Sequence, residues 1–231
     1  AGGTGLWGTL GPAVLLTAFI VLGVGMTFLS SRLLSGTLLK GVPSSFTLEL
    51  PPYRRPQVGK VIVRSIFDRT LFVLGRAAAV AAPAGLLIWV MANVRVGEVS
   101  LLGRCAAFLD PFGRLLGMDG VILMAFILGF PANEIVLPII FMGYLSAGVL
   151  MEPDGIWAVR DLLTANGWTP VTALCVMLFS LMHWPCSTTC LTIRKETGSL
   201  GWTALAVVLP TAMGMAACLL VAQGARIFAL L

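Results

Sequence analysis

Ionisable and metal-binding side chains lie inside long apolar runs of this sequence, where such groups are costly. Glu134 lies in the run 121–150, and His183, Cys186 and Cys190 lie in the run 171–193. Placing Asp at the centre of a membrane helix costs roughly 2.5–3.5 kcal/mol on insertion scales, so an intramembrane carboxylate usually serves a function. A carboxylate, an imidazole and a thiol together suit a borderline divalent transition metal such as iron(II).

Each of these residues also has a structural interpretation. Glu134 could bond backbone N–H groups at a helix break, and Asn133 could be an oxygen ligand or a cap for the next half-helix. A free Cys is more often a small buried apolar residue than a ligand. We assign that packing role to Cys105, Cys175 and Cys218. The predicted metal ligands are Glu134, Cys186, Asn133, His183 and Cys190.

Prolines are expected to interrupt both apolar runs beside these residues. Pro131, Pro138 and Pro185 each lack an N–H, so each frees the carbonyl four residues earlier, those of Ile127, Glu134 and Leu181. Unwound backbone at membrane depth survives only inside protein or beside a water-filled cavity, and paired interruptions point to a transporter site. We therefore expect the two interruptions to face each other. The predicted pore and hinge residues are Gly129, Pro131, Pro138 and Pro185, and the predicted caps of the resumed half-helix are Ser187, Thr188 and Thr189.

The composition indicates an integral membrane protein. The sequence is 58% hydrophobic and 11% charged, and its mean hydropathy is +0.98. The net charge of +5 comes from basic residues in short loops, without a basic patch interleaved with aromatics, so nucleic acid is not an expected partner. Five cysteines, an odd number, disfavour a disulfide scaffold. No hydrolase, P-loop or dinucleotide motif is present, so we do not expect an enzyme.

Hydropathy predicts an all-α, polytopic transmembrane helical bundle with two Pro-broken helices, either discontinuous or re-entrant. The expected apolar segments are 12–34, 72–94, 121–150, 171–193 and 200–222. Segment 121–150 is too long for one simple span, and parity favours a re-entrant hairpin over a discontinuous helix.

The segments between these spans are expected to be interfacial or cytoplasmic. Residues 32–76 hold eight of the fifteen basic residues and are assigned to the cytoplasm. Amphipathic helices are predicted at 61–74, at 96–120 (split by Asp110-Pro111) and at 156–163. The predicted domains are a first transmembrane helix (1–35), a cytoplasmic loop with an amphipathic helix (36–76) and a gate-type transmembrane domain (77–231). Because the chain begins without Met or a basic leader, we expect a fragment without a signal peptide.

Three motifs carry a resemblance to a known family. They are Glu49-Leu50-Pro51-Pro52-Tyr53-Arg54, Gly129-Phe130-Pro131-Ala132-Asn133-Glu134, and His183-Trp184-Pro185-Cys186 followed by Ile193-Arg194-Lys195-Glu196-Thr197-Gly198-Ser199. In this order and spacing the chain resembles the C-terminal membrane half, with the second gate, of the bacterial ferrous iron transporter (FeoB) family. The family often has Lys at the position of Asn133, and Tyr-Thr where this chain has His183-Trp184.

The resemblance implies a multi-pass inner-membrane iron(II) transporter in which Glu134 and Cys186 line the path. It implies iron(II) as substrate with no permanent cofactor, the lipid bilayer as surroundings, and a missing N-terminal half with a G domain and a first gate, in cis or in trans. The resemblance leaves homo-oligomerisation open. The alternative is a gate-domain membrane protein of the nucleoside-recognition or spore-maturation kind that moves no metal.

Overall fold

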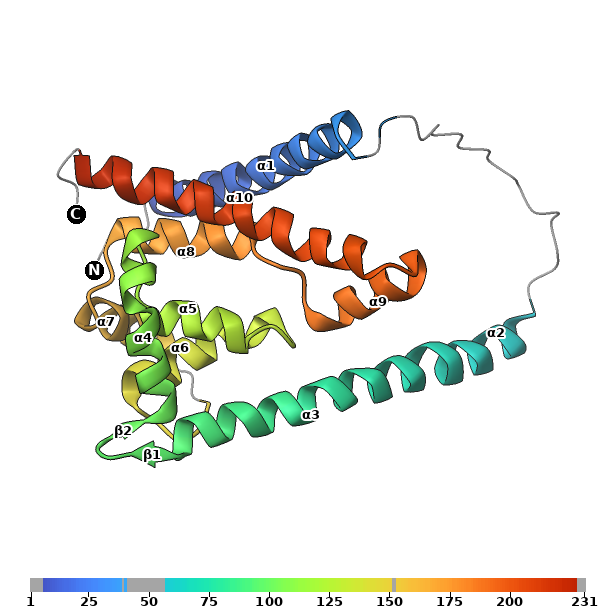
Figure 1. The fold of residues 1–231 in the computed structure, drawn as a ribbon, viewed down its shortest axis with the longest axis horizontal. Coiled ribbons are helices and arrows are strands. Elements are labelled where there is room, and N and C mark those ends of the chain that lie inside the picture. The colour runs from blue at the N-terminus through green and yellow to red at the C-terminus, as the bar shows by residue number, and fades with distance from the viewer. Residues whose placement is uncertain (1–5, 39, 41–56, 151–152, 228–231) are drawn as a thin grey trace. The chain divides into compact units, whose positions relative to one another are not determined.

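The computed structural model describes residues 6–38, 40, 57–150 and 153–227. The segment 49–54, which the sequence predicts to be extended, lies outside the described residues. The chain divides into two units, Ala1–Arg55 and Pro56–Leu231, and each is described by itself. Helices form nearly all of the regular structure of the described residues (Figure 1), so the expected all-α fold is confirmed.

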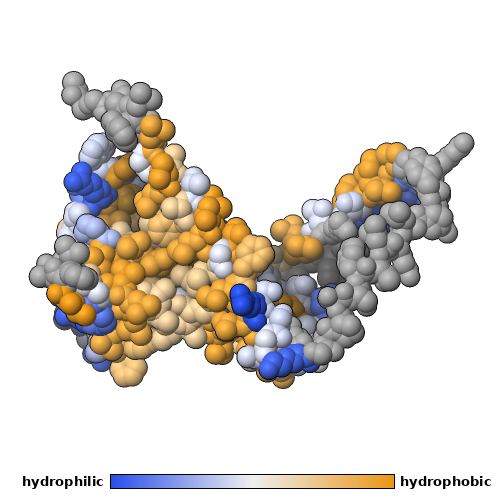
Figure 2. All heavy atoms as spheres, turned by 90° about the horizontal axis from the view of Figure 1, so that it is seen from above, coloured by the Kyte–Doolittle hydropathy of each residue, from blue (hydrophilic) through white to orange (hydrophobic). Residues whose placement is uncertain are grey.

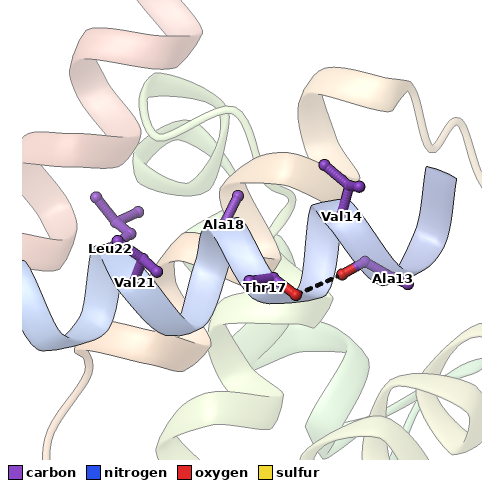
Figure 3. A pocket seen from close by; sticks show the side chains of 6 residues that line it. All are labelled: Ala13, Val14, Thr17, Ala18, Val21 and Leu22. Carbon is purple, nitrogen blue, oxygen red and sulfur yellow. Dashed lines mark hydrogen bonds between the residues drawn. The ribbon is translucent and has the colours of Figure 1, made fainter. Parts of the chain in front are cut away.

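The first unit contains one long helix, α1 (Leu6–Gly36), which includes the predicted span 12–34. The Thr17 hydroxyl donates to the Ala13 carbonyl at 2.8 Å (Figure 3), so this polar group is satisfied within the helix, as a membrane-embedded surface requires. An open apolar hollow runs along the same face of α1, lined by Ala13, Val14, Thr17, Ala18, Val21 and Leu22.

The second unit starts with a single helical segment made of α2 (Val58–Arg64), a π-helical stretch η1 (Ser65–Leu71) and α3 (Phe72–Asn93). The sequence predicts a separate interfacial helix over 61–74. The structure instead joins this helix to the following span, because no proline separates them. The predicted span 72–94 is confirmed by α3.

A short hairpin of β1 (Arg95–Val96) and β2 (Val99–Ser100) leads into α4 (Leu101–Leu115). The predicted split of α4 at Asp110-Pro111 is wrong, because the helix continues through Pro111. The Asp110 carboxylate stabilises the last turns of α4 through two bonds. Asp110 pairs with Arg114 at 2.7 Å and also accepts from the Gly120 N–H at 3.2 Å.

The chain then bends by 109° from α4 into α5 (Gly120–Leu128). Asp119 caps α5 by accepting a hydrogen bond from the Ile122 N–H at 2.7 Å. A Cβ atom at Gly120 would overlap the carbonyl oxygen of Ala106, so α4 and α5 cross with their backbones in contact.

The segment 121–150 folds as a helical hairpin. α5 ends at Leu128, a short 3-10 turn η2 (Asn133–Ile135) follows, and α6 (Val136–Leu145) returns beside α5 (Figure 1). A Cβ at Gly143, near the end of α6, would lie 2.7 Å from Cγ1 of Val121, at the start of α5. The two helices are therefore antiparallel, as parity favoured.

Four helices complete the unit: α7 (Gly155–Ala165), α8 (Pro170–Met182), α9 (Ser187–Thr197) and α10 (Leu200–Ile227). α7 contains the predicted short helix 156–163. α8 and α9 together form one candidate span, Pro170–Thr197, with a gap of four residues between them. α10 packs against both α8 and α9 and confirms the last predicted span.

The buried core lies between the hairpin, α8 and α10. Its largest fully buried side chains include Phe126, Ile139, Ile140, Cys175 and Cys218. Among the described residues, four helices are long and apolar enough to cross a membrane, or five if the bent pair α4–α5 forms one span. Apolar side chains cover much of the face in Figure 2, as expected for a multi-pass membrane protein.

Candidate functional site

The two interruptions meet through a backbone hydrogen bond. The Ser187 N–H, at the start of α9, donates to the Phe130 carbonyl, just after α5, at 2.9 Å. The expectation that the two interruptions face each other is therefore confirmed. The bond brings the hairpin tip, which carries Asn133 and Glu134, to the gap between α8 and α9, which carries His183 and Cys186.

Carbonyls at the hairpin tip are largely satisfied within the hairpin. The Ile127 carbonyl accepts from the Phe130 N–H at 3.3 Å, and the Gly129 carbonyl accepts from the Ala132 N–H at 3.0 Å. The prediction that Pro131 leaves the Ile127 carbonyl free is wrong, because the turn that follows α5 supplies another donor. The Phe130 carbonyl differs from these two, because it accepts its hydrogen bond from outside the hairpin, from the Ser187 N–H of α9.

Glu134 lies in η2 at the hairpin tip, and its side chain is exposed. Asn133 begins the same turn, is exposed as well, and makes no side-chain cap to α6. Pro138 is the third residue of α6, inside the first helical turn, where backbone N–H groups have no partner within the helix. Its missing N–H therefore causes no interruption there.

His183 ends α8 and lies among aromatic rings. Its ring centroid is 5.3 Å from that of Phe126 and 5.9 Å from that of Trp184. The Nδ1 atom lies 2.9 Å from the Ser180 carbonyl oxygen. A carbonyl only accepts, so Nδ1 carries the proton, and in the neutral ring Nε2 keeps a lone pair. Nε2 is buried and has no hydrogen-bond partner among the described residues.

Cys186 is the N-cap residue of α9, and its sulfur lies 3.1 Å from both the Thr188 and the Thr189 hydroxyl oxygens. The predicted capping by Ser187, Thr188 and Thr189 is wrong, because these residues lie inside the first turn of α9. The Cys190 thiol donates to the Pro185 carbonyl at 3.6 Å, across the same turn.

The structure brings the predicted ligands into two neighbouring segments rather than one cluster. Within the described part of the chain, no group of three or more His, Cys, Asp or Glu side chains could hold a metal ion. The metal assignment of Glu134, Cys186, Asn133, His183 and Cys190 stays a prediction. Cys175 and Cys218, predicted to pack, are fully buried against each other, and each thiol donates to the other residue's carbonyl.

A polar cluster at the base of the hairpin has no counterpart in the sequence predictions. The Tyr144 hydroxyl, near the end of α6, donates to the Asp119 carboxylate at 2.5 Å and accepts from the Trp168 indole N–H at 2.7 Å. The cluster joins both helices of the hairpin to the start of α8. One signal was readable: Asp119 directly precedes an apolar helix, the usual place of an N-cap.

Comparison with known families decides the affiliation of the chain. The family model described as "Gate: Nucleoside recognition" matches residues 74–200, which include both interruptions and the hairpin. This chain belongs to the Gate family. A second model, "Ferrous iron transport protein B C terminus", matches residues 16–68 of this Gate protein.

Curated relatives of this Gate chain are named as iron transporters. A Fe(2+) transporter FeoB of Staphylococcus aureus (strain MSSA476) is 30% identical over 209 residues, which cover 86% of this chain and 29% of that protein. The FeoB of Leptospira biflexa is 24% identical over 92% of this chain and 33% of its own length. The FeoB of Methanocaldococcus jannaschii is 25% identical over 80% of this chain and 28% of its own length. No solved structure matches the chain.

The resemblance of this Gate chain to the C-terminal membrane part of FeoB is thereby confirmed. The alternative, a gate-domain protein that moves no metal, is not favoured, because the second family model and these relatives all bear the iron-transport description. The chain spans a third or less of the length of these relatives.

Proposed function

We propose that this chain is the C-terminal membrane part of an iron(II) permease of the bacterial inner membrane, and that the ion passes where the two interrupted helices meet. The observation that carries the proposal is the 2.9 Å bond between Ser187 N–H and the Phe130 carbonyl. It holds the segment of Glu134 against the segment of Cys186. The iron-transport names of the relatives support the choice of ion.

The mechanism is stepwise replacement of part of the ion's water shell. Glu134 supplies an exposed carboxylate from the hairpin tip, and Cys186 supplies a thiol from the N-cap of α9. Binding by a few such groups is weak enough to let the ion leave again. Asn133, His183 and Cys190 are further ligand candidates, and Gly129, Pro131 and Pro185 are the proposed hinge positions.

The proposed pathway includes parts beyond this chain. We assign iron(II) as substrate without a permanent cofactor, and no enzymatic step to the chain itself. An N-terminal half with a G domain and a first gate, in cis or in trans, would complete the pathway. The greater length of the relatives supports this part of the proposal.

Uptake of radioactive iron(II) by iron-starved cells tests the proposal. Cells that lack their own ferrous transporter would carry the full-length protein, either unchanged or with Glu134→Gln or Cys186→Ser, at matched membrane abundance. We expect each variant to lose at least about tenfold in uptake rate, because loss even of a residue that only orients a metal ligand typically costs about 10–100-fold in affinity or activity.

Matched controls are Glu98→Gln, in the turn between β1 and β2, and Cys105→Ser, on α4. These make the same chemical changes away from the interruptions and should leave uptake unchanged. Normal uptake by both Glu134→Gln and Cys186→Ser would refute the assigned path.

A further inference from the structure

The hydrogen bond that joins the two interruptions also joins two opposite helix ends. The Ser187 N–H is the first of the N–H groups at the start of α9 that have no partner within the helix. The helix dipole is positive at this end. The Phe130 carbonyl follows the C-terminal end of α5, where the dipole is negative. A cation between these ends is attracted by the carbonyl and repelled by the N–H.

We propose that this hydrogen bond is a latch, and that a passing iron(II) ion displaces the Ser187 N–H and takes the Phe130 carbonyl oxygen as a ligand. This inference rests on the proposed function and adds a backbone ligand to it. Backbone carbonyls are common partners of ions in permeation paths, because they replace water oxygens without adding a fixed charge.

Three unpartnered polar atoms lie in the gap between α8 and α9 and on the first residue of α9. The Ser187 hydroxyl oxygen is buried, with the residue only 9% exposed, and has no hydrogen-bond partner within the described part of the chain. Trp184 Nε1 and His183 Nε2 are also buried atoms without a hydrogen-bond partner among the described residues, although the two residues are themselves partly exposed. A buried polar atom without a partner is costly. Water that accompanies the ion can bond these atoms when the latch opens, which offsets the loss of the backbone bond.

The two ends of the hairpin are held very differently. At the base, Asp119, Tyr144 and Trp168 form a hydrogen-bonded cluster, and Gly120 touches the backbone of α4. At the tip, a single backbone hydrogen bond among the described residues, from the Ser187 N–H to the Phe130 carbonyl, connects the hairpin to α9. The tip can therefore separate from α9 while the base stays in place.

Ser187→Pro is a selective test of the latch. It removes the N–H at the first position of α9, where proline is favoured, and Cys186 already has φ −61° and ψ 159°, which suit a residue before proline. Ser187→Ala is the matched control, since it removes the hydroxyl and keeps the N–H.

The assay is entry of iron(II), supplied anaerobically, into proteoliposomes that contain the full-length protein and a trapped quenchable dye. Loss of one backbone hydrogen bond should shift the closed state toward the open one by about fivefold. We expect passive entry through Ser187→Pro to be faster than entry through Ser187→Ala by about that factor, because both variants lack the hydroxyl and only Ser187→Pro lacks the N–H. Entry through folded Ser187→Pro that is equal to or slower than entry through Ser187→Ala would overturn the latch.

If Ser187→Pro does not fold, an amide-to-ester replacement at position 187 removes the N–H and keeps the hydroxyl, so its entry rate is compared with that of the unchanged protein by the same criterion. Glu134→Gln and Cys186→Ser in the same liposomes separate the two hypotheses. If both slow entry while the latch variants do not change it, only the latch is wrong. If neither slows entry, the proposed function fails, and the latch fails with it.

Discussion

At the scale of single residues, the Tyr144 hydroxyl is the centre of the polar cluster at the hairpin base. Tyr144→Phe would leave the Asp119 carboxylate and the Trp168 indole N–H each short of one partner. We expect the free energy of unfolding to fall by about 1–3 kcal/mol, the cost of half-buried polar groups without partners. Thermal unfolding in detergent micelles measures this as a lower Tm.

Thr164→Ala is the control for this prediction. It also deletes a hydroxyl, but one that bonds only to carbonyls of its own exposed helix, at 2.9 and 3.1 Å. Its Tm should stay close to that of the unchanged protein. An unchanged Tm for Tyr144→Phe would mean that the cluster does not stabilise the hairpin.

The sequence predicts the roles of single residues only where local rules decide them. It identifies the polar residues inside the apolar runs and the segments that contain them. The presence of two interruptions also predicts that these segments face each other. The sequence does not predict how the start of α9 is capped, because the Ser187 N–H donates to the carbonyl of Phe130. Phe130 lies 57 positions earlier, and no local sequence pattern indicates this contact. The same holds for Tyr144 and Trp168, whose polar tips meet Asp119 only in the folded chain.

At the scale of elements, the close crossing of α4 and α5 depends on Gly120. A Cβ there would overlap the Ala106 carbonyl oxygen and lie 2.7 Å from the Asp110 nitrogen, both backbone atoms that cannot turn aside. We expect Gly120→Ala to destabilise the protein by about 1–3 kcal/mol or more, since the helices must separate. The readouts are Tm in micelles and the yield of folded protein.

Gly85→Ala on α3 is the matched control, because nothing lies within 4 Å of a Cβ added there. A helical Gly→Ala change without a clash should stabilise by roughly 0.5–1 kcal/mol. Similar behaviour of the two variants would contradict the tight crossing.

Helix existence was predicted well, and helix ends and angles less so. Apolar length alone located α1, α3 and α10. The sequence placed a break at Pro111, but a proline can kink a helix without ending it, and the Asp110 side chain bonds across the turn. The 109° bend before α5 was not predicted, because it depends on contact between two backbones at Gly120.

At the scale of the whole molecule, the antiparallel hairpin makes a prediction about sidedness. If α5 enters the membrane and α6 returns to the same side, the segments around Glu98 and Asp161 lie on one face of the membrane. The segments around Lys60 and Lys195 then lie on the opposite face. Basic residues concentrate on the cytoplasmic face of membrane proteins, so we predict that Lys60 and Lys195 face the cytoplasm.

Single Cys substitutions at these four positions, in a protein whose five native cysteines are replaced by Ser, would be exposed to a membrane-impermeant maleimide on intact spheroplasts. We expect labelling at positions 98 and 161 in intact cells, and at 60 and 195 only after permeabilisation. Protection of position 161 together with labelling of 98 would mean that the chain crosses once between them. The hairpin would then not be re-entrant, and its tip would not meet the gap between α8 and α9 at membrane depth.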